Sequence, residues 1–182
     1  MRWTSKKVFS IIAGAALLLT VNNLEAEIVQ KCVNEADGFS IEFPAGWKLR
    51  ENPGEGVALT AVRPEEEPGE SIYERMEVRV LNEPGEDNDG FLQEHIADLQ
   101  DNLPAFELVS GGSEDLSGIP SRFLIHTFTD TFFTLKVLAQ AKQWIIQGDG
   151  RTYLITGLAT VESFPKHEKA FGKIAASFRL LE

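Results

Sequence analysis

Residues 36–47 decide the fold, and they read Ala-Asp-Gly-Phe-Ser-Ile-Glu-Phe-Pro-Ala-Gly-Trp. In their middle, residues 39–43 alternate apolar and polar side chains. Because neighbouring side chains of a β-strand point to opposite faces of the sheet, this alternation predicts a strand with one buried face. Pro44 has no backbone N–H to give to a neighbouring strand, so the strand is expected to end there.

The same alternation recurs along the chain and predicts further strands. They fall at residues 57–62, 76–80, 106–110, 122–127, 135–146 and 152–160. The last of these is apolar enough to be buried on both faces of a sheet. Two glycine-containing segments, Gly111-Gly112 and Gly148-Asp149-Gly150, are expected to turn the chain between strands.

Two segments have helical spacing instead. Apolar residues within 89–103 recur every three or four positions, with Asp89 as the expected N-cap and a proline as the stop. A second helix is expected at residues 164–177, with Ser163 as its N-cap and a proline in its first turn. Together with the strands, these helices predict a single α+β domain built on one antiparallel sheet of about six or seven strands.

The N-terminal residues read as a secretory signal peptide. A positively charged start is followed by an apolar stretch at residues 8–21 and a polar stretch at residues 22–26, which is the order of a signal sequence. The apolar stretch is shorter than the roughly 20 residues that a membrane-spanning helix needs. We therefore expect the protein to be exported.

The expected cut follows Ala26, which leaves residues 27–182 as one periplasmic or secreted domain. Leu24 is larger than the small residue preferred three places before a cut, so an uncleaved membrane anchor is the alternative. No lipid anchor is expected, because the single cysteine, Cys32, follows the charged Lys31 and lies away from the apolar stretch.

The chain is acidic, with 28 Asp and Glu against 17 Lys and Arg and a formal net charge of −11. Nucleic acids and anionic lipid head groups are bound through positive patches, so this composition argues against a nucleic-acid-binding function. Cationic or metal partners remain compatible with the charge. With one cysteine the chain can form no internal disulfide, even in an oxidising compartment.

No residue pattern typical of an active site is present. His95, His126 and His167 have no metal-binding spacing, and one cysteine cannot supply a pair of thiolates to zinc. The Gly-x-Ser-x-Gly turn of many serine hydrolases is absent as well. We therefore predict no catalytic residue, no cofactor and no enzyme activity.

The acidic segment 83–90 is the best candidate for a metal site. Its carboxylates are hard oxygen ligands of the kind that calcium binds, and they come from Glu83, Glu86, Asp87 and Asp89. Their order does not match an EF-hand loop, because no glutamate closes the loop at position 98. A solvated loop is the favoured interpretation, and a calcium- or cation-binding module is the alternative function.

Three phenylalanines, Phe128, Phe132 and Phe133, cluster where two strands are expected to meet. If their side chains are exposed, they form an apolar patch of the kind that marks a partner-binding surface. Packing beneath the helices is the other interpretation of the same cluster.

Two segments resemble the PsbP family of exported proteins, which includes DcrB-like bacterial relatives. Residues 36–47 are similar to the family's Gly-Phe-Ser entry, alternating strand and Pro-x-x-Trp ending. Residues 153–160 resemble its last buried strand, and residues 171–178 resemble the helix with a Ser-Phe ending that follows. The order and separation of the segments make the pair more specific than either alone, and the resemblance covers residues 36–180.

The resemblance implies an α/β/α sandwich with a central antiparallel sheet. It also implies a non-catalytic accessory or protein-binding role, because plant members are accessory subunits of photosystem II and others are periplasmic proteins or binding adaptors. This chain lacks the double targeting sequence of the plant members and the lipid-attachment cysteine of the cyanobacterial form. The resemblance therefore predicts an extracytoplasmic protein-binding module, with another protein as its partner, rather than a photosystem subunit.

Overall fold

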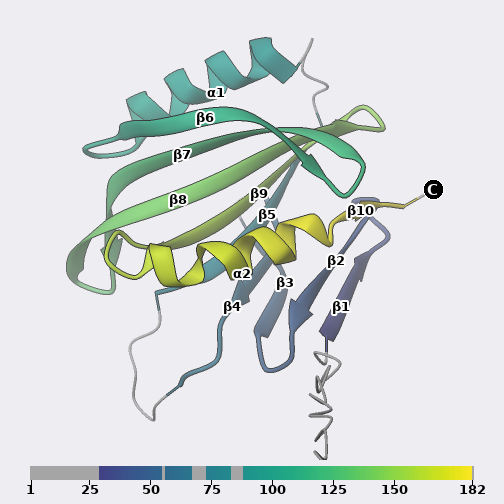
Figure 1. Ribbon diagram of the computed structural model, residues 1–182, viewed down its shortest axis with the longest axis horizontal. Helices are drawn as coiled ribbons and strands as arrows, with labels where there is room; N and C mark the ends of the chain where they lie inside the picture. Colours follow the sequence, from purple (N-terminus) through teal and green to yellow (C-terminus); the bar gives the residue numbers. More distant parts are fainter. Residues whose placement is uncertain (1–28, 55, 67–72, 83–87, 182) are drawn as a thin grey trace, which may run out of the picture.

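The computed structural model describes residues 29–54, 56–66, 73–82 and 88–181. Within these ranges the chain forms ten strands and two helices (Figure 1). The helices are α1 (Asn88–Asn102) and α2 (Phe164–Ala176). The strands are β1 (Val29–Asn34), β2 (Phe39–Pro44), β3 (Lys48–Gly54), β4 (Val57–Val62), β5 (Arg75–Leu81), β6 (Glu107–Leu116), β7 (Ile119–Phe132), β8 (Leu135–Gly148), β9 (Arg151–Thr160) and β10 (Arg179–Leu180).

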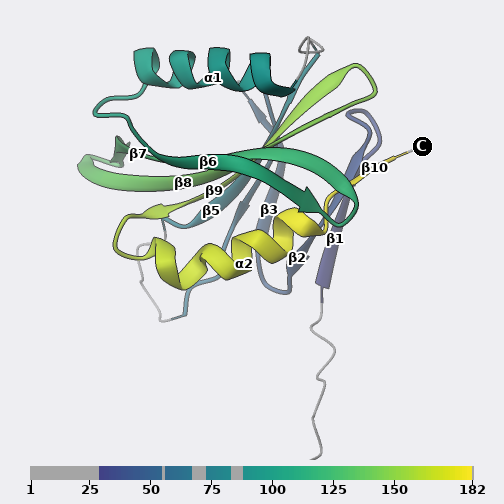
Figure 2. The same cartoon turned by 45° about the horizontal axis from the view of Figure 1, so that its top comes forward.

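Seven of these strands form one antiparallel sheet in the order β3-β4-β5-β9-β8-β7-β6. The helix α1 lies on one face of this sheet and α2 lies on the other, as the turned view in Figure 2 shows. The domain is therefore an α/β/α sandwich. The predicted α+β fold and its central antiparallel sheet are confirmed.

The face beneath α2 carries the main hydrophobic core. Trp144 on β8, Ile155 on β9 and Phe171 on α2 are fully buried in one cluster. Helix and sheet are in close contact at Gly157 on β9, where an added Cβ would lie 2.7 Å from the ring of Phe171. Since carbon atoms pack at about 3.5–4.0 Å, only glycine leaves room for that ring.

The strand that opened the sequence argument, β2, lies in a second sheet of three strands in the order β1-β2-β10. The strand itself is confirmed, and its side chains Phe39, Ile41 and Phe43 are buried. The sequence did not predict a separate small sheet. Its third strand is only two residues long and pairs with the start of β2, so no alternation pattern marks it.

The Ser-Phe ending of the chain closes this small sheet. The Ser177 hydroxyl accepts a hydrogen bond from the Glu42 backbone N–H at 2.8 Å and donates to the Ile174 carbonyl at 2.6 Å. The next ring, Phe178, stacks on Phe39 with centroids 5.6 Å apart. These contacts explain why the two resembling segments, far apart in sequence, belong together.

One predicted turn is wrong. Gly111 and Gly112 lie inside β6 rather than between strands, and the chain turns at Ser117-Gly118, where both φ angles are positive (55° and 93°). The glycines serve packing instead, because a Cβ on Gly112 would lie 3.1 Å from the ring of Phe123 on β7. The predicted turn at residues 148–150 is confirmed by positive φ angles at Asp149 and Gly150.

The two predicted helices are present, but their predicted caps are used differently. Asp89 lies within the first turn of α1, where its carboxylate pairs with Arg122 of β7. Ser163 precedes α2 as predicted, yet its hydroxyl makes no capping bond and donates to the Glu74 carboxylate at 2.6 Å. Tertiary hydrogen bonds have therefore replaced local ones at both helix starts.

The predicted signal peptide, residues 1–26, lies outside the described residues. Among the helices of the described residues, none combines the length and the apolar composition needed to cross a membrane.

Candidate functional site

The phenylalanine cluster lies at the tip of the β7–β8 hairpin, and the structure separates its members. Phe133 occupies the turn with a φ of 55° and is 84% exposed. Phe128 and Phe132 are half-buried and pack against Tyr73 and neighbouring residues of the sheet. Of the three rings, Phe133 is therefore the one exposed to solvent and available to a partner, while the other two pack within the domain.

Two leucines of β8 near this turn are also exposed, and they lie on opposite faces of the strand because they are three residues apart. Leu135 is 67% exposed and Leu138 is 54% exposed. We call Phe133, Leu135 and Leu138 together the hairpin tip. The sequence alternation could not single out these leucines, because apolar side chains in a strand are normally read as its buried face.

Contacts with Tyr73 hold the β7 strand just before the tip. The Phe132 ring meets the Tyr73 ring edge-on at 5.2 Å, and the Tyr73 hydroxyl donates to Asp130 at 2.6 Å. Burial and this hydrogen bond to a carboxylate raise the pKa of Tyr73, so the phenol stays protonated and continues to donate. The tip thus extends from a strand that these contacts hold in place.

A second feature is a hollow of about 440 Å³ between α1 and the sheet, which we call the α1 hollow. It lies over β5, β9, β8 and β7, beside the second half of the helix. Leucines form two sides of its wall, with Leu99 of α1 and Leu103 just after the helix on one side and Leu154 and Leu158 of β9 on the other.

A chain of hydrogen bonds crosses this hollow. His95 of α1 bonds through Nε2 to the Gln143 side-chain oxygen at 2.5 Å, and the Gln143 amide donates to the Thr156 hydroxyl at 2.8 Å. These contacts tie the helix to β8 and β9. Burial lowers the pKa of His95, which favours the neutral ring.

The second histidine of the hollow, His126, is only 3% exposed. Its ring lies between Phe106 and Phe128, with centroids 5.4 and 5.7 Å away, and its Nδ1 has no hydrogen-bond partner among the described residues. Burial, with a smaller contribution from nearby His95, lowers the pKa of His126 to about 4. The ring is therefore neutral at pH 7.

Charged side chains of β5 also line the α1 hollow, and they pair with one another or with Asp130 of β7. Arg75 bonds to Glu77 at 2.8 Å and approaches Asp130 at 3.6 Å, while Arg79 lies 3.9 Å from Glu77. These two arginines and two carboxylates largely neutralise one another, and Asp98 of α1 adds a further carboxylate to the lining.

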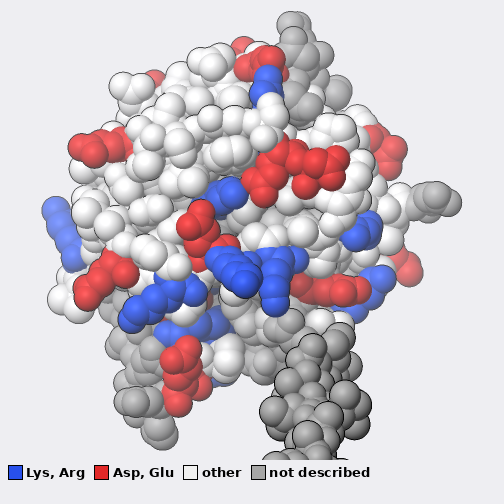
Figure 3. All heavy atoms as spheres, viewed as in Figure 1, with Lys and Arg blue, Asp and Glu red and all other residues white. Residues whose placement is uncertain are grey.

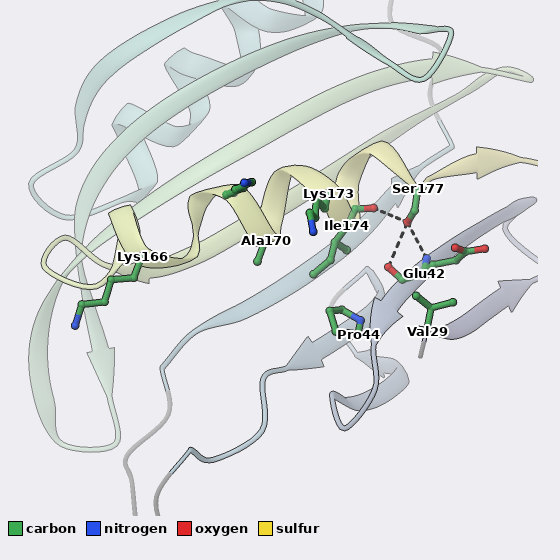
Figure 4. Close-up of a pocket in the computed structure, with 9 residues that line it drawn as sticks. Val29, Glu42, Pro44, Lys166, Ala170, Lys173, Ile174 and Ser177 are labelled. Atoms are coloured by element: carbon green, nitrogen blue, oxygen red, sulfur yellow. Dashed lines mark hydrogen bonds between the residues drawn. The ribbon is translucent and has the colours of Figure 1, made fainter. Parts of the chain in front are cut away.

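A third feature is a groove of about 420 Å³ between α2 and the small sheet, which we call the α2 groove. Figure 4 shows Ile174 pointing from the helix toward Pro44 and Val29. Lysines line the helix side of the groove at positions 166, 169 and 173. Figure 3 shows Lys and Arg side chains gathered over α2 in a chain that is acidic as a whole.

The predicted metal ligands are not brought together within the described residues. Glu83, Glu86 and Asp87 lie outside them, and Asp89 is paired with Arg122. In the part of the chain that the structure describes, no group of three or more His, Cys, Asp and Glu side chains could hold a metal ion. Cation binding by residues 83–90 stays a prediction.

The single cysteine is a core residue. Cys32 on β1 is buried, and burial together with the nearby Glu51 carboxylate raises the pKa of its thiol. A thiol held in its protonated form is a poor nucleophile. Its position therefore agrees with a structural role.

Comparison with known proteins finds a likeness of fold. No protein-family model and no curated protein matches the chain. The solved structure of cyanobacterial PsbP (CyanoP) from Synechocystis sp. PCC 6803 superposes with a TM-score of 0.57 and 16% identity, covering 90% of this chain and 98% of that one. LpqN of Mycobacterium tuberculosis, described as involved in cell envelope biogenesis, gives 0.59 and 16%, covering 85% and 92%.

A Pseudomonas aeruginosa protein of unknown function, described as a putative regulator, gives a TM-score of 0.50 at 14% identity, covering 80% of this chain and 92% of that one. At such identities the likeness concerns the fold alone. The chain has a PsbP-like fold, as the resemblance of its two sequence segments predicted.

Proposed function

We propose that this PsbP-like domain is a non-catalytic, extracytoplasmic accessory protein that binds another protein through the hairpin tip. The observation that carries the proposal is the exposure of Phe133, 84% of whose surface faces solvent at the end of a well-packed hairpin. Large aromatic side chains held in this way are typical of the residues that dominate protein interfaces.

Energetics support the tip as a docking element. Burying one Phe or Leu side chain is worth about 1.5–3 kcal/mol, and Phe133 at the tip is exposed for such burial. The Tyr73–Asp130 hydrogen bond and the Phe132 ring already hold the hairpin. Binding a partner would therefore cost little conformational entropy. The expected partner is a protein with an apolar pocket that accepts an aromatic ring.

The cellular setting of the proposal comes from the sequence and from the fold. The predicted signal peptide places residues 27–182 outside the cytoplasm. One protein of similar fold, LpqN, is described as involved in cell envelope biogenesis. We therefore place the partner in the cell envelope.

The test compares two variants in affinity purification from cross-linked envelope fractions. Phe133→Ser should remove the co-purifying partner, whereas Val109→Ser should leave it in place, since Val109 is also exposed (58%) but lies on β6, away from the tip. Equal recovery of the same partner with both variants would show that the tip is not the docking element.

The α2 groove favours a second candidate, which is binding of an acidic segment of a partner. Its lining combines apolar side chains with three lysines, Lys166, Lys169 and Lys173, which outnumber the one lining carboxylate, Glu42, in a chain with a net charge of −11. Opposite charges guide association and fix its register. Replacing the three lysines with glutamine should weaken partner binding and remove its salt dependence, and an unchanged salt dependence would count against this candidate.

A further inference from the structure

The exposed sides of the two helices carry opposite charges. On α2, Lys166, Lys169 and Lys173 are exposed and line the α2 groove, where they outnumber its one carboxylate. Glu168 is the one acid within α2, and it lies at least about 100° around the helix from each of these lysines. The lysines therefore form a basic stripe along the helix side of the groove.

The exposed side of α1 is acidic instead. Glu94, Asp98 and Asp101 are exposed, and the helix contains no lysine or arginine. Their spacings of four and three residues place the carboxylates along one side of the helix. Asp98 also accepts a hydrogen bond from Asn102 at 2.8 Å, and its side chain remains at the surface. These three carboxylates form an acidic stripe.

The two stripes match in length and in spacing. The outer lysines are seven residues apart, and so are the outer carboxylates, which makes each stripe about 10 Å long at about 1.5 Å per residue. If the two helices run antiparallel, each lysine of one stripe comes level with a carboxylate of the other. Ala97 and Ala170 also come level near the middle, and their small side chains allow a close approach of the helices.

The stripes cannot meet within one molecule, because α1 and α2 lie on opposite faces of the sheet (Figure 2). We propose that the α2 groove binds the acidic stripe of α1 from a second copy of this chain. This inference rests on the second candidate function and identifies its acidic segment as α1 of another copy. Since each copy carries the two stripes on opposite faces, the contact is head-to-tail and joins copies into a chain or a ring.

The net charge of the chain sets the conditions for this contact. Copies with a charge of −11 repel one another as a whole, whereas the paired stripes attract. At physiological ionic strength, charges more than about 8 Å apart are largely screened, and pairs in contact are screened less. One helix pair is a small interface, so the expected dissociation constant is about 0.1–1 mM. In about 1 M salt the screening length falls to about 3 Å, and the association should be lost.

Sedimentation of the exported domain from about 20 µM to about 1 mM, at physiological ionic strength, tests the proposal. The average mass of the wild type should rise with concentration. K166E/K173E places acids at both ends of the basic stripe and should weaken the association about tenfold or more. The matched control, K31E/K136E, changes the net charge equally at two exposed lysines outside the groove lining, and it should weaken the association far less.

A charge swap provides the positive control. E94K/D101K/K166E/K173E exchanges the charges at the ends of both stripes and leaves the net charge of the chain unchanged. It should therefore restore association to about the wild-type level. A loss caused by misfolding of K166E/K173E would not be rescued by two further substitutions, so this variant separates the two causes.

Three results would overturn the proposal. The first is a wild type that stays monomeric at about 1 mM, which would exclude a second copy as the occupant. The second candidate function would survive that result if replacing the three lysines with glutamine still weakened binding of the envelope partner. The second result is an equal loss of association in K31E/K136E and K166E/K173E. The third is a charge-swap variant that stays monomeric.

Discussion

The two helices cover opposite faces of the same sheet in different ways. On α2, four side chains are buried, and they are Phe164, Phe171, Ile174 and Ala175. On α1, no side chain from residue 89 to residue 102 is buried, and its apolar residues are at most half-buried. The α2 face therefore carries the packed core that stabilises the fold. The α1 face is packed less tightly, and the hollow beside it is lined partly by polar side chains.

The largest expected effect comes from truncating the same residue type on each helix. Phe171→Ala should lower the free energy of unfolding by about 3–5 kcal/mol, because it leaves a cavity in the packed core. Phe91→Ala on α1 should cost only about 1 kcal/mol, because its half-buried ring leaves a site that solvent can enter. Urea denaturation of both variants measures the difference, and equal losses would contradict the contrast between the helices.

The α1 face should also make the protein sensitive to acid. The pKa of His126 is about 4 in the folded state and about 6.5 when the ring is exposed. Between pH 6.5 and pH 4 the His126 ring binds a proton in the unfolded state but not in the folded state. The free energy of unfolding is therefore highest above pH 6.5 and falls as the pH is lowered to about 4. The expected loss between pH 7 and pH 5 is about 2 kcal/mol.

Denaturation at several pH values measures this loss. His126→Phe cannot take up the proton, so its stability should change less over the same interval, with a smaller remaining slope from His95, whose pKa is also lowered. Identical pH profiles of the variant and the wild type would show that His126 is not the group responsible.

The smallest expected effect comes from adding volume to the α1 face, and the α2 face provides the comparison. The side chain of Ala141 lines the α1 hollow, so Ala141→Val should change the free energy of unfolding by less than about 1 kcal/mol. Gly157→Ala, under α2, should cost about 1–3 kcal/mol, because its new Cβ would lie 2.7 Å from the ring of Phe171. A larger loss for Ala141→Val than for Gly157→Ala would mean that the hollow is tightly packed.

The sequence predicted the parts of this fold that depend on local patterns. Both helices and the strand around Phe39 follow from the spacing of apolar residues. The third strand of the small sheet did not, because β10 is two residues long and exists only through its pairing with β2. The supposed turn at Gly111-Gly112 failed for a similar reason, since the glycines make room for Phe123 on the next strand.

The candidate sites were less predictable than the fold. The phenylalanine cluster was visible in the sequence, but only the positive φ angle of Phe133 and the packing of Phe132 against Tyr73 separate the exposed ring from the packed one. The α1 hollow brings His95 and His126 together from a helix and a strand. Their spacing in sequence contains no signal for this meeting, because the packing of α1 on the sheet creates it.

The most direct test of the account is photo-cross-linking from the hairpin tip in living cells. A benzophenone amino acid placed at position 133 should cross-link the protein to one partner in the cell envelope. The same amino acid at position 109, equally apolar and also exposed, should not. No adduct from position 133, or the same adducts from both positions, would contradict the proposal that the tip binds a specific partner.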